Sequence, residues 1–588
     1  MSAPSWLNTP HTLREYAFVA DGERGAVIGP HGDIAWMCFP QWDSDPLFSA
    51  LLDGGGTYAV TPTERHVWGG YYEPRSLIWR SRWASCDALV ECRQALALPA
   101  DPERVTILSR ATVQRGSCKL CVVLNPLAGF GRHGMRDLAR DEDGIWRASV
   151  GGFQLSWSGG ERARVVKQGP HRGLELELQM QDGEQHDFVL VISANGDPEV
   201  PPKPDTAWHE TEQAWHERVG DFAHTIAPDD SAHSYAVLRG LSSLGCGGMV
   251  AAATTSLPER AEAGRNYDYR YVWIRDQCYA GEAAAAAGAL DLLDDSVRFV
   301  TTRIAEHGKE LRPAYTVRGT AIPDQQQLDV KGYPGGNAVA GNQVRHQFQL
   351  DNFGEILLLL TAAARQDHLE AEGWRAAELA AATILERWHE PDAGIWELDP
   401  AQEWTHSRLI CAAGLRAIST LPAARQHASS WLSTADAIVA HTSRRAVHKS
   451  GYWQRAPDDS DVDAALLLGG LRGALASDDP RTVATCAAVE RDLSRDFYCY
   501  RFRPDARPLG EAEGAFVLCG FWMALALEQQ GHSHQAARWF ERNRAACGPP
   551  GLLSEEFDVT QRQLRGNLPQ AFAHALLLEC AATLRGES

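Results

Sequence analysis

The chain contains no apolar run long enough to cross a membrane, because no stretch approaches the ~18 apolar residues that a spanning helix needs. It also contains no run of five or more basic residues, and its 76 acidic residues outnumber its 56 basic ones. The resulting net charge of −20 repels the phosphates of nucleic acids and the headgroups of anionic lipids. These absences predict that neither nucleic acid nor a membrane is a partner.

The signatures of several other chemistries are also missing. The sequence has no Walker A nucleotide-binding pattern, no His-Glu-x-x-His pattern and no Gly-x-Ser-x-Gly pattern, and its 21 histidines do not cluster at zinc-ligand spacing. The segment Met1–Trp6 lacks the basic and apolar regions of a signal peptide. The 13 cysteines are odd in number, and many fall in apolar helical runs, as reduced core residues do. We therefore expect a cytoplasmic protein that requires no metal or other cofactor.

The sequence pattern divides the chain into two parts. Residues 1–200 contain short β-branched or alternating runs, such as 104–108, separated by clusters of Gly, Asp and Pro. This spacing predicts antiparallel sheets packed as an N-terminal β-sandwich. A proline-rich break at 196–204 follows. We therefore assign 201–230 to a linker that carries a helix, and 231–588 to a C-terminal helical domain.

The helical domain has apolar runs that continue around the helix, for example 464–468 and 516–527. Helices that are apolar on all sides must be buried on more than one face. About twelve candidate helices, several of them with such runs, fit two concentric rings of six, so the pattern predicts an (α/α)6 barrel. The stretch 308–350, rich in Gly, Pro, Gln and Asn, interrupts the rhythm and is predicted to be an ordered substrate loop. The predicted helices start near Ser234, Asp276, Asp291, Asn352, Ala371, Ser407, Ser429, Asp461, Arg481, Gly514, Ser533 and Pro569.

Two glutamates stand among aromatic and turn residues, where one helical stretch has ended and the next has not begun. Glu397 follows Trp396, whose apolar wall would penalise the charged form of a carboxyl, as a general acid requires. Glu555 and Glu556 lie in a turn-like segment near the C-terminus. Two carboxyls brought together by a fold can cleave a glycosidic bond, one as acid and one as base. On composition alone each could also be an ordinary loop acid, and Glu513 could simply be a favourable charge at a helix start.

The stretch 266–276 is the densest cluster of aromatic and charged residues. Aromatic rings can stack on the face of a pyranose, and Arg and Asp can make charge-assisted hydrogen bonds to its hydroxyls. The purely structural alternatives are a helix N-cap role for Asp276 and an ion pair for Arg275. The predicted substrate-binding residues are Tyr271, Trp273, Arg275, Asp276, Trp396, Glu513, Glu556 and Gln349.

Several ordered motifs resemble those of glycoside hydrolase family 15, the glucoamylase family, in its bacterial form. The matching segments are Gly32–Pro40, Ala252–Glu259, Asn266–Asp276, Gln349–Glu355, Pro391–Glu397 and Asn567–His574. The resemblance covers nearly the whole chain. It implies an N-terminal β-sandwich and a C-terminal (α/α)6 barrel, in agreement with the reading from the residues.

The resemblance also implies a mechanism. It implies inverting hydrolysis of an α-glucosidic bond at a non-reducing end, with release of β-glucose. Carried over by motif, Glu397 is the general acid, Glu555 is the general base, and Arg275 and Asp276 grip the non-reducing glucose. At working pH Glu555 should be ionised and Glu397 protonated.

The leading functional hypothesis is a glucoamylase-like hydrolase of short α-gluco-oligosaccharides, with a small sugar as its only expected partner and no assignment of oligomeric state. An α,α-trehalase is the close alternative, and activity on isomaltose or dextran is a third. A disaccharide phosphorylase is a different enzyme class that can share this architecture, but it would need no base at Glu555. A sugar-binding relative without activity would be expected to have lost Glu397 or Glu555, and both are present.

Overall fold

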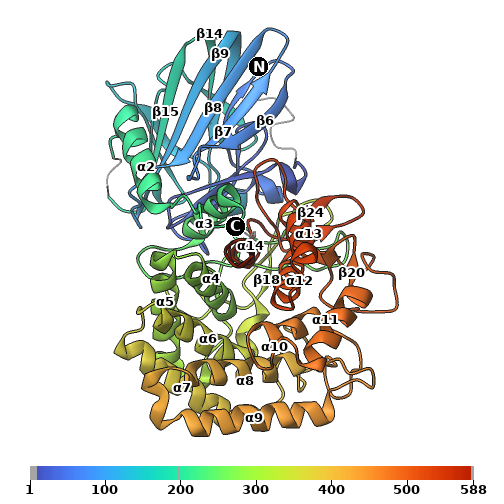
Figure 1. Cartoon of the computed structure of the whole chain (residues 1–588). Coiled ribbons are helices and arrows are strands. Elements are labelled where there is room, and N and C mark those ends of the chain that lie inside the picture. Colours follow the sequence, from blue (N-terminus) through green and yellow to red (C-terminus); the bar gives the residue numbers. More distant parts are fainter. Residues whose placement is uncertain (1–9, 197–198, 585–588) are drawn as a thin grey trace.

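The computed structural model in Figure 1 describes residues 10–196 and 199–584 of the 588. The expected absence of a signal peptide concerns Met1–Trp6, which lies outside the described residues. None of the described helices is both long and apolar enough to cross a membrane. All 13 cysteines are free, and most of them are buried, as predicted for reduced core residues.

The N-terminal part of the chain is built from antiparallel sheets, as predicted. A four-stranded sheet in the order β1-β2-β3-β4 lies beside an eleven-stranded one in which β10-β11-β12-β15-β9-β8-β7-β6 run side by side. In the larger sheet β5 and β14 also pair with β9, and β13 pairs with β14. The strands are β1 (Ala17–Ala20), β2 (Gly25–Ile28), β3 (Ile34–Cys38), β4 (Pro46–Phe48), β5 (Thr57–Pro62), β6 (Val67–Tyr72), β7 (Trp79–Ala84), β8 (Ala88–Leu96), β9 (Arg104–Asn125), β10 (Arg136–Arg140), β11 (Trp146–Val150), β12 (Phe153–Ser158), β13 (Arg164–Gln168), β14 (His171–Gln181) and β15 (Gln185–Ser193).

Strand β9 holds the two halves of the larger sheet together. Its first part pairs with β8 and β15, and its second part pairs with β5 and β14. The change of partners falls at Gly116, which has a φ of +80°. A Cβ atom there would lie 1.9 Å from the carbonyl oxygen of Asp87, so only glycine fits at this position of the strand. The alternating inward residues of both halves form one apolar core.

Helix α2 (Pro204–Arg218) occupies the segment that the sequence assigns to a linker helix. It packs against the sheet, because the Leu98 N–H donates to Thr211 Oγ1 (3.0 Å) and Arg93 lies 4.2 Å from the centre of the Trp208 ring. The helix therefore extends the sandwich on its outer side, as Figure 1 shows. The boundaries at 200 and 230 stay a prediction.

The C-terminal part is the predicted barrel of two helical rings. Helices α4, α6, α8, α10, α12 and α14 contact one another in succession, and α14 closes the ring on α4. The helices between them form the outer ring, each packed against an inner one. The bounds are α3 (Pro228–Leu241), α4 (Ile274–Ala286), α5 (Leu290–His307), α6 (Asp351–Arg365), α7 (Ala371–Arg387), α8 (Thr405–Ser419), α9 (Ala428–Arg445), α10 (Leu467–Leu471), α11 (Pro480–Leu493), α12 (Val517–Gln529), α13 (Ser533–Arg544) and α14 (Ala571–Thr583).

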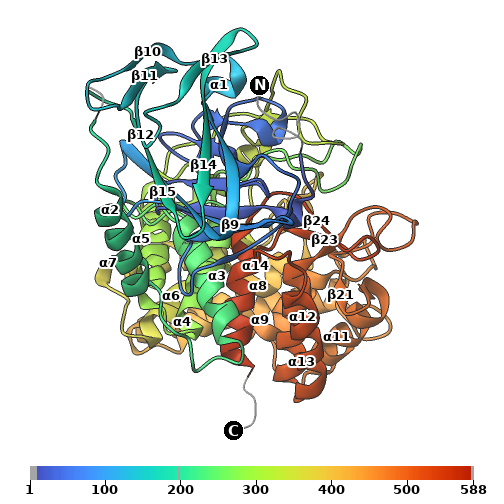
Figure 2. The ribbon, with the colours of Figure 1, turned by 90° about the horizontal axis from the view of Figure 1, so that it is seen from above.

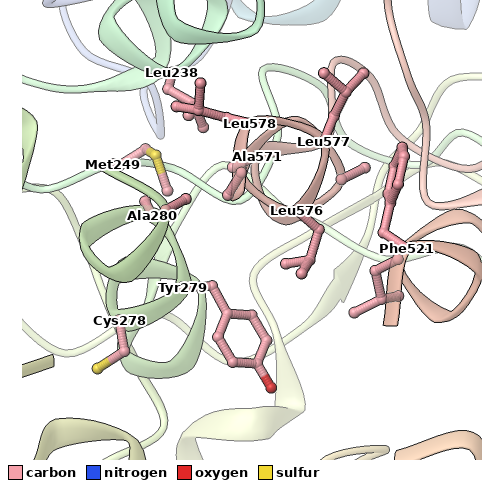
Figure 3. Packing of buried hydrophobic residues seen from close by; sticks show 14 of the residues in the cluster. Leu238, Met249, Cys278, Tyr279, Ala280, Phe521, Ala571, Leu576, Leu577 and Leu578 are labelled. Carbon is pink, nitrogen blue, oxygen red and sulfur yellow. The ribbon is translucent and has the colours of Figure 1, made fainter. Parts of the chain in front are cut away.

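The inner helices are apolar on every side because each is covered by neighbours all round. In α12 the residues Val517 to Leu527 are all buried, which is the pattern that predicted a helix within the core. Figure 3 shows the result where α4, α14 and α12 meet, with Tyr279, Leu576 and Phe521 filling the space between them. One inner helix departs from the prediction: α10 has only five residues and follows a 3-10 turn at Ala464–Leu466.

Short strands and loops cover the N-terminal ends of the inner helices. Figure 2 shows β23 and β24 near the upper ends of α12 and α14. The short strands of the C-terminal part are β16 (Val272–Trp273), β17 (Ala314–Tyr315), β18 (Gln326–Gln327), β19 (Val339–Ala340), β20 (Ser494–Arg495), β21 (Tyr498–Cys499), β22 (Ala515–Phe516), β23 (Glu556–Asp558) and β24 (Gln563–Arg565). The short helix α1 (Ala128–Gly131) belongs to the sandwich instead.

The sandwich supports the segment that leads into α4. Trp36 of β3 donates its indole N–H to the carbonyl oxygen of Ala253 (2.9 Å). The buried Arg270 pairs with Asp268 (2.7 Å) and donates to the carbonyl oxygen of Ser44 (3.0 Å). These contacts cross from one part of the chain to the other, so the position of residues 250–276 depends on both.

The close approach of α6 and α8 gives a test of the barrel packing. A Cβ atom on Gly354 would lie 2.6 Å from the backbone carbonyl of Ile410, which cannot rotate away. We expect Gly354→Ala to lower the free energy of unfolding by about 1–3 kcal/mol despite the better helix propensity of alanine. Thermal unfolding measures this. Gly69→Ala is the matched control because a Cβ there meets open space. An unchanged or higher midpoint in Gly354→Ala would contradict the packing described here.

Candidate active site

A pocket of about 550 Å³ opens at the N-terminal ends of the inner helices. It is lined by residues from the segments that precede or begin α4, α8, α12 and α14, together with the start of β23. Both predicted glutamates, Glu397 and Glu555, are among them. The lining residues are Ala251, Tyr269, Trp273, Arg275, Asp276, Tyr279, Ile395, Trp396, Glu397, Arg501, Phe516, Leu518, Glu555, Gln570 and Phe572.

Glu397 lies in the loop between α7 and α8, with a left-handed backbone (φ 57°). Such a conformation is costly for a residue with a Cβ atom and is often kept for function. Its Oε1 accepts hydrogen bonds from Trp273 Nε1 (2.7 Å) and Gln349 Nε2 (3.3 Å) and lies 3.4 Å from Arg275 Nη2. Three donors on one oxygen fix the direction of this carboxyl and leave Oε2 available to a ligand.

Glu555 immediately precedes β23, the middle strand of the small sheet β22-β23-β24. The hydroxyl of Tyr269 lies 3.2 and 3.1 Å from its two carboxyl oxygens. Burial raises the pKa of Glu555 well above its ordinary value, and the charges of Glu259 and Glu556 raise it further, whereas Arg501 lowers it. A general base must be ionised, so this environment opposes the ionisation that the sequence analysis expects of Glu555.

One aromatic pair connects the two glutamates. The Tyr269 ring meets the Trp273 ring edge-on, with 5.6 Å between ring centres. Tyr269 holds Glu555 and Trp273 holds Glu397, so a chain of three contacts runs from one carboxyl to the other. The two rings thus lie between the carboxyl groups of Glu397 and Glu555 and separate them within the same pocket.

Four of the eight predicted substrate-binding residues line the pocket. Trp273 and Arg275 are described above, and Arg275 also bonds Gln349 Oε1 (2.9 Å) and Asp351 (3.3 Å). Asp276 is buried, and its Oδ1 has no hydrogen-bond partner among the described residues. Burial raises the pKa of Asp276 to about 7. A buried carboxyl oxygen without a partner is a natural acceptor for a ligand hydroxyl.

Trp396, the fourth lining residue, is fixed from behind. Its indole N–H donates to Asp463 (2.8 Å), and its ring meets Phe516 edge-on at 5.5 Å. Burial raises the pKa of Asp463 to about 6, and the hydrogen bond from Trp396 opposes that rise. The ring is therefore held as a wall of the pocket rather than left free to turn.

The other four predicted residues lie behind the lining. Tyr271 packs in a small apolar cluster with Ala314 and Ile322. Gln349 touches Arg275 and Glu397 from the side away from the cavity. Glu513 and Glu556 pair with arginines beneath Glu555. None of these four is among the residues that line the pocket, so any effect on a substrate would pass through their neighbours.

The predicted substrate loop at 308–350 has a different main role. Tyr333 donates to the carbonyl oxygen of His11 (2.6 Å), and the Gly332 N–H donates to Leu52, so part of the loop fastens the sandwich to the barrel. Arg345 and His346 bond within the loop itself, to Ile322 and Asp324. Its end reaches Glu397, because Gln347 Nε2 donates to the Glu397 carbonyl oxygen (3.3 Å) and Gln349 Nε2 donates to Glu397 Oε1 (3.3 Å).

Sequence reasoning missed several lining residues. Tyr269 lies inside the cluster that was singled out, and its alternation with Tyr271 and Trp273 was the available signal. Phe516 opens an apolar run and Gln570 and Phe572 lie in a family motif, so those signals were available, whereas Arg501 lies in a loop without a periodic pattern; only folding brings the four together. No group of His, Cys, Asp and Glu side chains in the described part of the chain is arranged to hold a metal ion.

A family model described as "Glycosyl hydrolases family 15" matches residues 233–582, more than half of the chain. The chain belongs to glycosyl hydrolase family 15. A second model, "Trehalase-like, N-terminal", matches residues 5–207. Membership of family 15 confirms the predicted family, the predicted glycosidase class and the predicted architecture of sheets followed by a helical barrel.

Relatives of this family-15 chain cover it almost from end to end. It is 28% identical to a trehalase of Mycolicibacterium smegmatis, over 98% of this chain and 92% of the relative. It is also 28% identical to a trehalase of Mycobacterium tuberculosis, over 98% and 90%. Among solved structures, a bacterial glucoamylase complexed with acarbose matches with a TM-score of 0.69 at 14% identity, over 99% of this chain and 95% of that one. At that identity the structural match shows the shared fold alone.

The buried pair of Arg275 and Asp351 gives a test of the site. We expect Arg275→Met to destabilise the protein by about 3–5 kcal/mol near neutral pH, because it leaves the Asp351 carboxylate buried without its cation. The loss should shrink at lower pH, since burial already raises the pKa of Asp351 to about 6 and the protonated form needs no cation. Unfolding midpoints as a function of pH measure both effects.

The double variant Arg275→Met/Asp351→Asn is the control for that test. It removes the unpaired charge as well, so it should recover most of the stability. A double variant as unstable as Arg275→Met alone would contradict the pairing as the source of the loss.

Proposed function

We propose that the chain is an inverting α,α-trehalase, which hydrolyses the α-1,1 bond between two glucose units. The observation that carries the proposal is the end-to-end similarity to trehalases, over 98% of the chain, together with the trehalase-like match of its N-terminal part. This moves the trehalase alternative ahead of the glucoamylase-like hypothesis that the sequence analysis placed first.

The pocket supports a small sugar as the substrate. Aromatic rings can cover the faces of pyranose units, and Arg275 and Asp276 offer charged partners to hydroxyl groups. The rings that contribute to the wall are Tyr269, Trp273, Tyr279, Trp396, Phe516 and Phe572.

In the proposed reaction Glu397 is the general acid and Glu555 the general base. Glu555 takes a proton from a water molecule, whose oxygen attacks C1 of one glucose from the face opposite the bond to be broken. The C1–O bond breaks, its electron pair goes to the bridging oxygen, and Glu397 delivers a proton to that oxygen. Inversion at the attacked carbon gives one β-glucose, while the leaving glucose keeps the α configuration.

The hydrogen bonds of the site fit these roles. Trp273, Arg275 and Gln349 all bond one oxygen of Glu397, which directs the other oxygen to the scissile bond. Tyr269 holds both oxygens of Glu555 in a fixed plane and stabilises the carboxylate by donating to it. The helix N-terminus that begins at Ile274 adds a favourable dipole for anionic groups at the pocket.

A substrate panel tests the proposal. Trehalose, maltose, isomaltose, kojibiose and nigerose are offered separately, and the product anomers are followed by NMR before they equilibrate. We expect turnover of trehalose with equal initial amounts of α- and β-glucose. Turnover of maltose or isomaltose in preference to trehalose would instead favour the glucoamylase-like hypothesis. Turnover that requires inorganic phosphate and forms glucose phosphate would indicate a phosphorylase.

Substitution of the two glutamates tests their roles. Glu397→Gln and Glu555→Gln should each lower kcat on trehalose by at least ~10²-fold, the scale of a lost acid or base, while the unfolding midpoint stays close to that of the parent. Glu511→Gln is the matched control because this glutamate is exposed on the nearby loop. Near-normal activity in either site variant would remove that residue from its proposed role.

Tyr269→Phe tests how the base is held. Removing the hydroxyl should lower kcat by roughly 10- to 100-fold, the value of a hydrogen bond to a charged group. Tyr452→Phe is the control, because it removes an equivalent hydroxyl, which donates to the carbonyl oxygen of Ser460 (3.4 Å), from a residue that does not line the pocket. Equal losses in the two variants would mean that the bond to Glu555 is not the source of the effect.

A further inference from the structure

Four carboxyl groups and two guanidinium groups meet beneath the pocket. Arg265 pairs with Glu259, with Glu513 (3.0 Å) and with Glu556 (3.4 Å). Arg501 pairs with Glu513 (2.9 Å). Glu555 completes the group, which we call the carboxyl cluster: Glu259, Glu513, Glu555 and Glu556 with Arg265 and Arg501. Carboxylates outnumber cations in it, and all four carboxylic residues are buried.

Glu259 is the member of the cluster that touches Glu555 directly. Both side chains lie over Gly566, where an added Cβ atom would be 3.6 Å from Glu259 Cγ and 3.9 Å from Glu555 Oε2, and the charge of Glu259 raises the pKa of Glu555. The same added Cβ atom would lie 3.7 Å from Glu555 Cβ, so the two side chains flank Gly566 at van der Waals distance. Gly566 also has a φ of +81°, a conformation that favours glycine.

The segment that carries Glu259 is tied to the segment that follows β24. The Gly566 N–H donates to the carbonyl oxygen of Pro258 (3.0 Å). The side-chain oxygen of Asn567 accepts from the Leu257 N–H (3.3 Å) and from Thr254 Oγ1 (2.9 Å). These bonds fix Glu259 beside Glu555 whether or not a ligand is present, and the bond from Arg265 fixes the orientation of its carboxyl.

We propose that Glu259, clamped by Arg265, is a positioning residue for the general base: it hydrogen-bonds Glu555, directs its carboxyl toward the pocket, and shares one proton with it. The proposal rests on the proposed role of Glu555 as the base. Two carboxyls in contact cannot both carry a full charge in a buried site, so the pair holds one proton over a wider pH range than an isolated glutamate would. Glu259 therefore sets the acidic limit of activity.

The charges that face Glu555 from every side agree with this role. Glu259 and Glu556 oppose its ionisation, Arg501 favours it, and burial opposes it most strongly. Tyr269 donates to it from the pocket side. Glu397 lies farther away, beyond Tyr269, and its charge also bears on that tyrosine. Removing the charge of Glu259 should make Glu555 ionise at lower pH, and a glutamine there can still donate a hydrogen bond to the carboxylate.

The test is the pH dependence of kcat/KM on trehalose, which reports the essential groups of the free enzyme. We expect the acidic limb in Glu259→Gln to move to lower pH by about 1 unit or more relative to the parent protein. Glu511→Gln removes an equal charge from an exposed site and should leave the limb in place. An acidic limb that stays in place or moves to higher pH in a folded Glu259→Gln variant overturns the proposal, whatever the loss of rate.

Glu259→Asp is the second variant, in case Glu259→Gln does not fold. It keeps the charge for Arg265 but withdraws the carboxyl from Glu555 by one methylene, so the limb should move in the same direction by less. An unmoved limb in this variant also overturns the proposal. The two failures can be told apart. Near-normal activity in Glu555→Gln would refute the proposed role of Glu555 as the base. An inactive Glu555→Gln together with an unmoved acidic limb in Glu259→Gln would refute only the role of Glu259.

Discussion

The structure of the site depends on how buried carboxyl groups are compensated. Glu397, Glu555 and Asp276 line one pocket; Glu397 is partly exposed, whereas burial penalises the negative charges of Glu555 and Asp276. The compensation is specific to each group: Arg275 and Trp273 for Glu397, and Tyr269 and Arg501 for Glu555. Each of these partners is itself fixed by a second contact, as Arg275 is by Asp351. The pocket therefore cannot be changed at one residue without disturbing the charge on another.

The two parts of the chain divide this work unequally. Every lining residue lies between 251 and 572, in the barrel and the loops at its mouth. The sandwich contributes support instead, because Trp36 and the backbone of Ser44 hold the segment that carries Tyr269 and Trp273. That segment bears contacts to both glutamates, so a domain that never touches the cavity still helps to set its geometry.

The sequence was informative where burial leaves a periodic trace. The predicted starts at Ser533 and Ala371 coincide with α13 and α7, and the fully apolar runs identify inner helices because neighbours cover them on all sides. The short α10 was not foreseen, since a run of leucines has the same pattern whether five or fifteen residues are helical. Tyr271 and Trp273 share one motif and one apolar cluster, but only Trp273 is among the residues that line the pocket, and a motif alone does not show which of its side chains reach the cavity. Arg501 was not predicted, because its contacts with Glu513 and Phe516 depend on how the loop between them folds, and that loop leaves no periodic pattern.

The raised pKa of Glu555 sets a physical problem that the neighbourhood also answers. A carboxylate buried among other carboxyls is more basic but is ionised less often, and burial alone favours the protonated form of Glu555. In the proposed pair of Glu259 and Glu555 the two carboxyl groups titrate together. One proton belongs to the pair, and the negative charge can reside on the Glu555 oxygen that faces the attacking water. Tyr269 donates only to Glu555 and so favours that placement of the charge. The same burial that weakens an isolated base thus keeps a strong proton acceptor ready at one defined position.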